Sequence, residues 1–174
     1  DRPNVMIKVP GTREGVPAIE RLLSDGININ VTLLFSPERY VEVAVAFVKA
    51  LETRVSAGRP IDRVASVASF FVSRVDTEVD KRIEKIGGAA LTLRGKAAIA
   101  NAQLAYTAFG DLVRSTRWSR LQGKGARPQR VLWASTGAKN PAYSDVIYVD
   151  GLVAPDTVNT LPPATLTQFE DHGT

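Results

Sequence analysis

A chain of 174 residues, 44% hydrophobic and 23% charged, is long enough for one domain with a buried core, and this balance excludes disordered and fibrous classes. The absence of cysteine excludes disulfides and thiolate chemistry, and the single histidine excludes a histidine triad or a multi-histidine metal centre. A net charge of +4 suits either nucleic acid or a small anionic substrate such as a phosphorylated metabolite. We expect the histidine, His172, on the surface or in a loop.

The first predicted strand, residues 5–9, is apolar except for Lys8 near its end, and the breaker Pro10-Gly11-Thr12 follows at once. Surface lysines normally lie on polar faces or in loops, so a lysine at the exit of a buried-looking strand needs an explanation. A lysine in an apolar setting can act as a Schiff-base nucleophile, because the neutral amine attacks carbonyl groups. The alternative is a solvated lysine that merely ends the strand.

A helix is predicted from Thr12, which can cap it, to Leu23, with Gly26 closing it. The next strand, 27–34, alternates in character. One side carries Ile27, Ile29, Val31 and Leu33, and the other carries Asn28, Asn30 and Thr32. A polar row would leave buried amides unsatisfied in a sheet covered on both faces, whereas in a barrel it faces an interior that can hold a ligand.

Strand-like and helix-like segments continue to alternate, which is typical of a parallel α/β fold. Ser36 and Pro37 are expected to begin a helix whose apolar face is Tyr40, Val43, Ala44, Phe47, Val48 and Leu51. Further strands are predicted at 64–72, 131–135 and 156–161, with a short extended segment at 146–149. Further helices are predicted at 77–86, 95–109 and 111–121, and a partial one from residue 163.

Two polar segments invite functional interpretation. The loop Thr136 to Pro141 contains a glycine and Lys139, and freed backbone amides beside a lysine suit a phosphate, although these residues alone favour an ordinary turn. Gly123-Lys124-Gly125 lacks the spacing of a Walker loop and is interpreted as a turn. Asp76, Glu78 and Asp80 are expected in the N-terminal turn of their helix, where negative charge complements the helix dipole.

Three segments, in matching order and spacing, resemble the transaldolase family: residues 7–12 (IKVPGT), 26–36 (GININVTLLFS) and 68–76 (ASFFVSRVD). Residues 159–166 (NTLPPATL) and 169–173 (FEDHG) also resemble its long bacterial form. The resemblance covers essentially the whole chain. It implies an α/β TIM (β/α)8 barrel in which residues 1–174, one domain, supply strands four to eight. Strands one to three are expected to lie outside this chain, which then looks like the later part of a longer protein.

By this resemblance Lys8 is the Schiff-base lysine, Thr32 helps to hold a catalytic water, and Asn30 orients substrate hydroxyl groups. The remaining implied contacts to substrate are Ser69, Phe71, Arg74, Ser135 and Lys139. Of these, Lys139 falls near a family arginine of the phosphate site, and lysine lacks the bidentate fork of arginine. The polar groups are expected toward the carboxyl ends of the strands, where barrel enzymes place their sites.

The implied reaction transfers a dihydroxyacetone unit between sugar phosphates of the pentose phosphate pathway. Sedoheptulose 7-phosphate and glyceraldehyde 3-phosphate give erythrose 4-phosphate and fructose 6-phosphate, with no cofactor and no metal. In the family, an aspartate of the first strand and a glutamate of the third carry the proton transfers. Because both strands are expected outside this chain, residues 1–174 alone are expected to be inactive.

Two alternatives remain. One is another class I aldolase such as a fructose 6-phosphate aldolase. The helices predicted between strands 64–72 and 131–135 of this chain favour transaldolase, the larger enzyme. The other is a noncatalytic basic domain that binds nucleic acid through Arg114, Arg117, Arg120, Lys124, Arg127 and Arg130.

The partners expected from this reading are sugar phosphates, not nucleic acid or a membrane, and a homodimer is left open. No apolar stretch reaches the ~18 residues of a membrane span, and no charged-then-apolar leader opens the chain. A cytoplasmic location is therefore the default expectation.

Overall fold

The computed structural model describes residues 3–174 and contains one sheet of five parallel strands in the order β1-β2-β3-β4-β5. The strands are β1 (Ile7–Pro10), β2 (Ile29–Leu34), β3 (Ser66–Phe71), β4 (Arg130–Ala134) and β5 (Thr157–Asn159). Each overlaps its predicted segment, so the α/β class and the five strands are confirmed. The arrangement is consistent with part of a (β/α)8 barrel.

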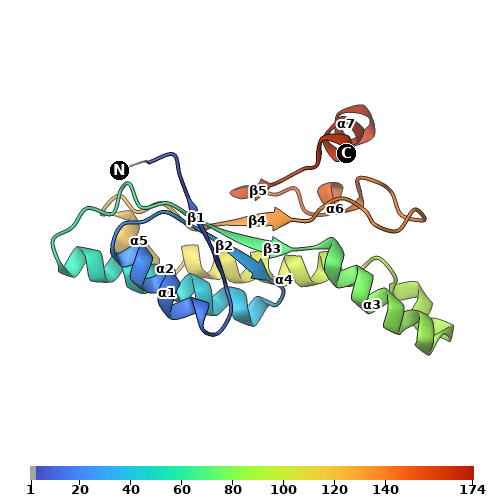
Figure 1. Cartoon of the computed structure of the whole chain (residues 1–174), viewed down its shortest axis with the longest axis horizontal. Helices are drawn as coiled ribbons and strands as arrows, with labels where there is room; N and C mark the ends of the chain where they lie inside the picture. The colour runs from blue at the N-terminus through green and yellow to red at the C-terminus, as the bar shows by residue number, and fades with distance from the viewer. Residues whose placement is uncertain (1–2) are drawn as a thin grey trace.

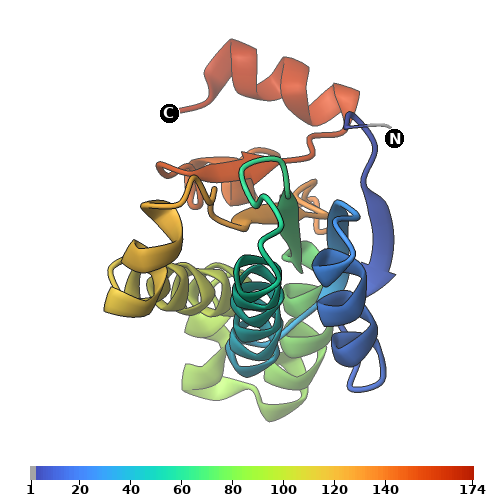
Figure 2. The same cartoon turned by 90° about the vertical axis from the view of Figure 1, so that its left-hand side faces the viewer.

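Most of the helices lie on one side of this sheet (Figure 1). That side carries α1 (Gly15–Ser24), α2 (Pro37–Ser56), α4 (Ala97–Val113) and α5 (Thr116–Gln122). Helix α3 (Ser73–Ile86) runs out beyond the end of β3, and a short 3-10 helix, Gly88–Leu93, follows it. The remaining helices are α6 (Ile147–Asp150) and α7 (Pro163–His172), and Figure 2 shows α7 on the other side of the sheet from α1 and α2.

The helix-facing side of the sheet forms the main core. Its strand residues Ile29, Val31, Ala68, Phe70, Val131 and Trp133 are buried in one cluster with helix residues such as Ile19, Leu23, Phe47 and Trp118. Phe70 and Trp133 meet edge to face, with ring centroids 6.3 Å apart. Burying each large apolar side chain contributes about 1.5–3 kcal/mol, so this face holds the helices to the sheet.

The beginning of α2 follows its sequence signals. The Ser36 hydroxyl accepts a hydrogen bond from the Arg39 amide at 3.2 Å, and Pro37 occupies the first helical position. All six residues of the predicted apolar face of α2 are buried. Thr12 likewise accepts a bond from the Gly15 amide, although α1 begins only at Gly15.

The segment predicted as extended at 146–149 is instead part of helix α6, so that prediction is wrong. Its branched and aromatic residues favour strands locally, but Val146, Tyr148 and Val149 are all buried by tertiary packing. The Asp150 amide also bonds to the Val146 carbonyl and closes a helical turn. Packing and local hydrogen bonding override the strand propensity here.

Two expectations about the strands need correction. β1 is exposed, not buried, because β2 is its one neighbour within the described residues; of its residues, Val9 packs against the core. On β2, a register shift between Val31 and Leu34 gives Leu33 a φ of 60° and turns it outward. Leu33 is 42% exposed and Leu34 takes its place in the core, while Ile27 precedes the strand and is also exposed.

His172 lies on the surface, as expected, in the last turn of α7. Among residues 3–174, no helix has both the length and the apolar character that crossing a membrane would require.

Candidate active site

The side of the sheet turned away from α1 and α2 carries the predicted polar row and is called the inner face. Lys8 lies opposite Asn30 in the β1–β2 register, and Asn30 lies opposite Val67 in the β2–β3 register. Residues in register on parallel strands point to the same side, and so do residues two apart on one strand. Lys8, Asn30 and Ser69 therefore share the inner face.

A hydrogen bond joins two members of this row. The Ser69 hydroxyl donates to Asn30 Oδ1 at 2.7 Å. This bond occupies the amide oxygen, so the NH2 group of Asn30 remains available as a donor for a ligand. Ser69 and Thr32 are buried, Asn30 is half-buried and Lys8 is exposed. Solvent exposure on this face therefore increases from the Ser69 hydroxyl to the Lys8 amine.

The positions along the strands differ from expectation. Lys8 is the second residue of β1 and Asn30 the second of β2, so both lie in the first halves of their strands and not toward the carboxyl ends. Phe71, in contrast, ends β3, and Ser135 directly follows β4. Both strands begin two residues later than predicted, at Ile7 and Ile29, so fewer strand residues precede Lys8 and Asn30 than the sequence pattern indicated.

An apolar cluster lies beside the polar row on the inner face. Val67, Leu132 and Ala134 are buried there, and Phe71 and Val158 pack against them. This cluster is separate from the main core, which lies on the other face. It gives the candidate site an apolar wall.

Arg74 extends this wall at the carboxyl end of β3. Its guanidinium carbon lies 4.8 Å from the centroid of the Phe71 ring, and the Phe35 ring lies 5.2 Å from that of Phe71. Such a cation–π contact holds a guanidinium in place while leaving its N–H groups free to bind an anion. Arg74 is exposed, in the first turn of α3.

Ser135 lies next to the beginning of α3. Its hydroxyl is 2.9 Å from the Ser73 hydroxyl, and its carbonyl accepts a bond from the Ser73 amide. Ser135 has a φ of 59°, a conformation that costs a residue with a side chain roughly 1–3 kcal/mol and is enriched at functional sites. The strained turn places Ser135 beside Ser73, the residue that precedes Arg74.

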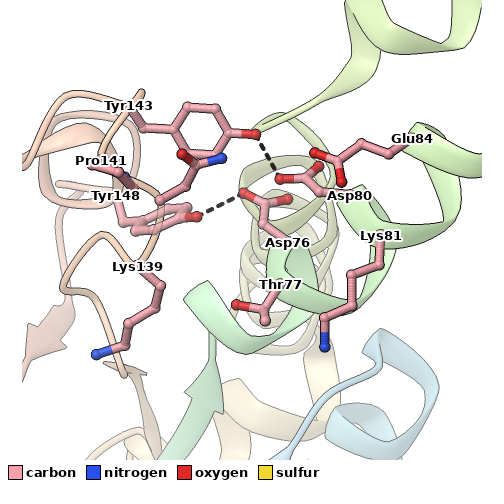
Figure 3. A pocket seen from close by; sticks show the side chains of 10 residues that line it. Asp76, Thr77, Asp80, Lys81, Glu84, Lys139, Pro141, Tyr143 and Tyr148 are labelled. Carbon is pink, nitrogen blue, oxygen red and sulfur yellow. Dashed lines mark hydrogen bonds between the residues drawn. The ribbon is translucent and has the colours of Figure 1, made fainter. Parts of the chain in front are cut away.

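Lys139 reaches the same helix from the loop after β4. It is exposed and lines a cavity of about 310 Å³ between α3 and residues 139–148, together with Asp76 and Thr77 (Figure 3). The structure therefore gathers the predicted residues in two groups. The inner face holds Lys8, Asn30, Thr32, Ser69 and Phe71, and the region at the beginning of α3 holds Arg74, Ser135 and Lys139.

The acidic residues of α3 do not all have the role expected of them. Glu78 is exposed, and a hydrogen bond from Lys81 lowers its pKa. Asp76 does lie in the first turn, but Asp76 and Asp80 are both buried and bond to other elements. Desolvation raises the pKa of Asp76, against the opposing effect of bonds from the Ala98 amide and Tyr148. Their spacing of four places both carboxylates on one helix face, a signal of shared burial that sequence reasoning overlooked.

Comparison with known proteins gives matches along the whole chain. Residues 1–174 match a family model described as Transaldolase/Fructose-6-phosphate aldolase. The chain is 59% identical over 175 residues to a transaldolase of Thermobifida fusca, covering 100% of this chain and 48% of that protein. It is 58% identical over 172 residues to a transaldolase of Saccharopolyspora erythraea, covering 99% and 47%.

A transaldolase of Acidothermus cellulolyticus is 57% identical over 173 residues, which are 99% of this chain and 46% of that protein. The chain thus spans about half the length of the curated relatives it matches.

Proposed function

The chain belongs to the transaldolase/fructose-6-phosphate aldolase family, and from this premise we propose that it supplies the nucleophile and part of the substrate site of a transaldolase. The observation that carries the proposal is the inner face, where Lys8 lies opposite Asn30 and Asn30 is held by Ser69. An accessible amine beside an oriented amide suits attack on a hydroxylated ketone.

The proposed reaction begins with neutral Lys8. Its amine adds to the C2 carbonyl of fructose 6-phosphate or sedoheptulose 7-phosphate, and loss of water gives an iminium ion. The C4 hydroxyl gives its proton to an acid–base carboxylate proposed from strand one or three, the C3–C4 bond breaks, its electron pair flows into the iminium, and an aldose phosphate leaves. The enamine left on Lys8 attacks the aldehyde of an acceptor such as glyceraldehyde 3-phosphate, whose oxygen takes up that proton. Hydrolysis of the new iminium releases the product ketose and the free amine.

The neighbours of Lys8 have distinct proposed roles. Asn30 donates its NH2 group to a substrate hydroxyl, in the orientation set by Ser69. Thr32 holds the water that enters and leaves with the iminium. Phe71, backed by the apolar cluster of the inner face, packs against the carbon chain of the sugar.

The phosphate group is assigned to the residues near the beginning of α3. Arg74 offers a forked guanidinium held over Phe71, Lys139 offers a compact positive charge, and Ser135 a hydroxyl. Within the basic segment considered for nucleic acid, Arg117 pairs with Glu52 and Arg114 with Asp111. These two pairings offset part of the positive charge that binding to nucleic acid would use.

We place residues 1–174, as one domain, at strands four to eight of the barrel. The acid–base aspartate and glutamate would then come from strands one and three. On this assignment the 174 residues alone are inactive, and the full-length protein is the form to assay.

Borohydride trapping tests the proposal. Full-length protein is incubated with fructose 6-phosphate, reduced with borohydride and mapped by peptide mass spectrometry. A three-carbon adduct on Lys8 is expected, Lys8→Ala should lose both adduct and transfer, and Lys139→Ala should retain the adduct. An adduct on another lysine, or none on folded protein, contradicts the assignment. Release of free dihydroxyacetone without need of an acceptor aldehyde would instead favour a fructose 6-phosphate aldolase.

A further inference from the structure

The loop that carries Lys139 is tied to α3 by two tyrosines (Figure 3). Tyr143 donates its hydroxyl to Asp80 Oδ2 at 2.6 Å, and Tyr148 donates to Asp76 Oδ2 at 2.9 Å. Hydrogen bonds to a charged acceptor are roughly twice as strong as neutral ones, so these two bonds are well suited to hold a loop.

The second oxygen of each carboxylate bonds to a different part of the chain. Asp76 Oδ1 accepts from the Ala98 amide at 2.8 Å, and Asp80 Oδ1 accepts from the Gly95 amide at 3.2 Å. Gly95 has a φ of 70°, and a side chain there would press on the Tyr143 ring at 3.0 Å. Each aspartate therefore joins three parts of the molecule: α3, the beginning of α4 and the tyrosine-bearing segment.

Burial makes these connections costly to lose. Asp76 is 1% exposed, Asp80 7% and Tyr148 2%. A buried carboxylate that loses a hydrogen-bond donor is left undersatisfied, because water does not readily replace the donor. Burial also raises the pKa of Tyr148, so that its hydroxyl keeps its proton and remains a donor.

Lys139 lies between two anchors of the same segment. Thr136 is fully buried and donates to Asn159 Oδ1 at 2.8 Å, while Tyr143 and Tyr148 hold the other end. The Lys139 side chain itself points away from the tyrosine–aspartate pairs (Figure 3). The anchors thus fix the backbone from which Lys139 extends without engaging its amine.

We propose that Tyr143 and Tyr148, held by Asp80 and Asp76, are positioning residues that place Lys139 for the phosphate group of the sugar substrate. The inference rests on the proposed function, which assigns Lys139 to that phosphate. It adds a specific expectation: the tyrosines act on recognition of the phosphate and not on the chemistry at Lys8.

The test compares two acceptors in the full-length protein. Tyr143→Phe and Tyr148→Phe are each expected to raise the KM for glyceraldehyde 3-phosphate about fivefold to thirtyfold, the factor that corresponds to a loss of about 1–2 kcal/mol. Their kcat, and their KM for unphosphorylated glyceraldehyde, should change by less than about twofold. Tyr40→Phe is the matched control, because it removes a buried tyrosine hydroxyl that has no hydrogen-bond partner among residues 3–174.

A double-mutant cycle adds a second readout. If Tyr143 acts through Lys139, Tyr143→Phe should have little further effect on the KM for glyceraldehyde 3-phosphate in a Lys139→Met background. Equal KM changes for both acceptors, no KM change for either, or additive effects of the two substitutions would overturn the inference. Absence of transfer in the parent protein would refute the proposed function instead, so the two failures are distinguishable.

Discussion

The bond from Ser69 to Asn30 Oδ1 determines how an amide is presented beside Lys8. Ser69→Ala leaves that oxygen without its donor and frees the amide to rotate. We expect kcat/KM of the full-length protein for fructose 6-phosphate to fall about fivefold, the effect of a hydrogen bond of about 1 kcal/mol.

Ser66→Ala is the matched control for Ser69→Ala. It removes the same hydroxyl from the same strand, but Ser66 donates to the Ile29 carbonyl instead of to a residue of the inner face. It should lower the midpoint of chemical denaturation with little effect on kcat/KM. Unchanged kinetics in Ser69→Ala, or an equal loss in both variants, would argue against the role of this bond.

Residue-scale predictions succeeded where they depended on strand periodicity. The alternation of β2 was enough to place Asn30 and Thr32 together on one face. The exposure of Lys8 depends on how many strands flank β1, and the outward turn of Leu33 depends on a register shift, and neither is written in local alternation. The tyrosine partners of Asp76 and Asp80 come from a distant segment, so only their shared helix face was predictable.

At the scale of elements, helix α7 is attached through its last turn. His172 Nε2 lies 2.8 Å from Asp145 Oδ1 and Nδ1 lies 3.0 Å from Asp171 Oδ2, and the Thr174 amide bonds to Asp150. The bond to Asp145 and, to a smaller extent, the bond to Asp171 raise the pKa of His172 above its ordinary 6.5. The protonated histidine therefore favours the docked helix.

The sign of the pH dependence follows from this shift. For a histidine whose pKa is raised on docking, the stabilisation is fully present below pH 6.5 and is lost as the pH rises through the higher pKa of the docked state. Hydrogen exchange of the α7 amides, corrected for intrinsic rates, should be slower on the acid side of this range than on the alkaline side. Asp145→Asn should reduce the difference, and an unchanged or reversed dependence would contradict the role of His172.

Elements were predictable where signals agreed and not where they conflicted. Ser36 and Pro37 mark the beginning of α2 in the sequence, and the structure bears this out through the bond to the Arg39 amide. Helix α3 begins at Ser73, four residues before the predicted start, because the Ser73 amide bonds to the carbonyl of Ser135, which follows the neighbouring strand β4. Such a long-range contact has no local signal.

At the scale of the whole molecule, β1 and β5 are the edges of the described sheet. Ile7 on β1 is 49% exposed, and an apolar edge with unpaired backbone groups favours association. We expect residues 1–174 expressed alone to self-associate in light scattering after size exclusion and to show no transfer. Ile7→Lys should reduce the association without restoring transfer, whereas a monomeric fragment that catalyses transfer would contradict both expectations.

The agreement between strand order and chain order also bears on how the protein is made. Every strand after β1 pairs with a strand that precedes it in the sequence. During synthesis on the ribosome, each strand after β1 therefore emerges when its preceding partner has already been made. A nascent chain stalled after β3 already contains both described neighbours of β2, whereas β3 still lacks β4. Folding of this sheet can thus advance in step with translation.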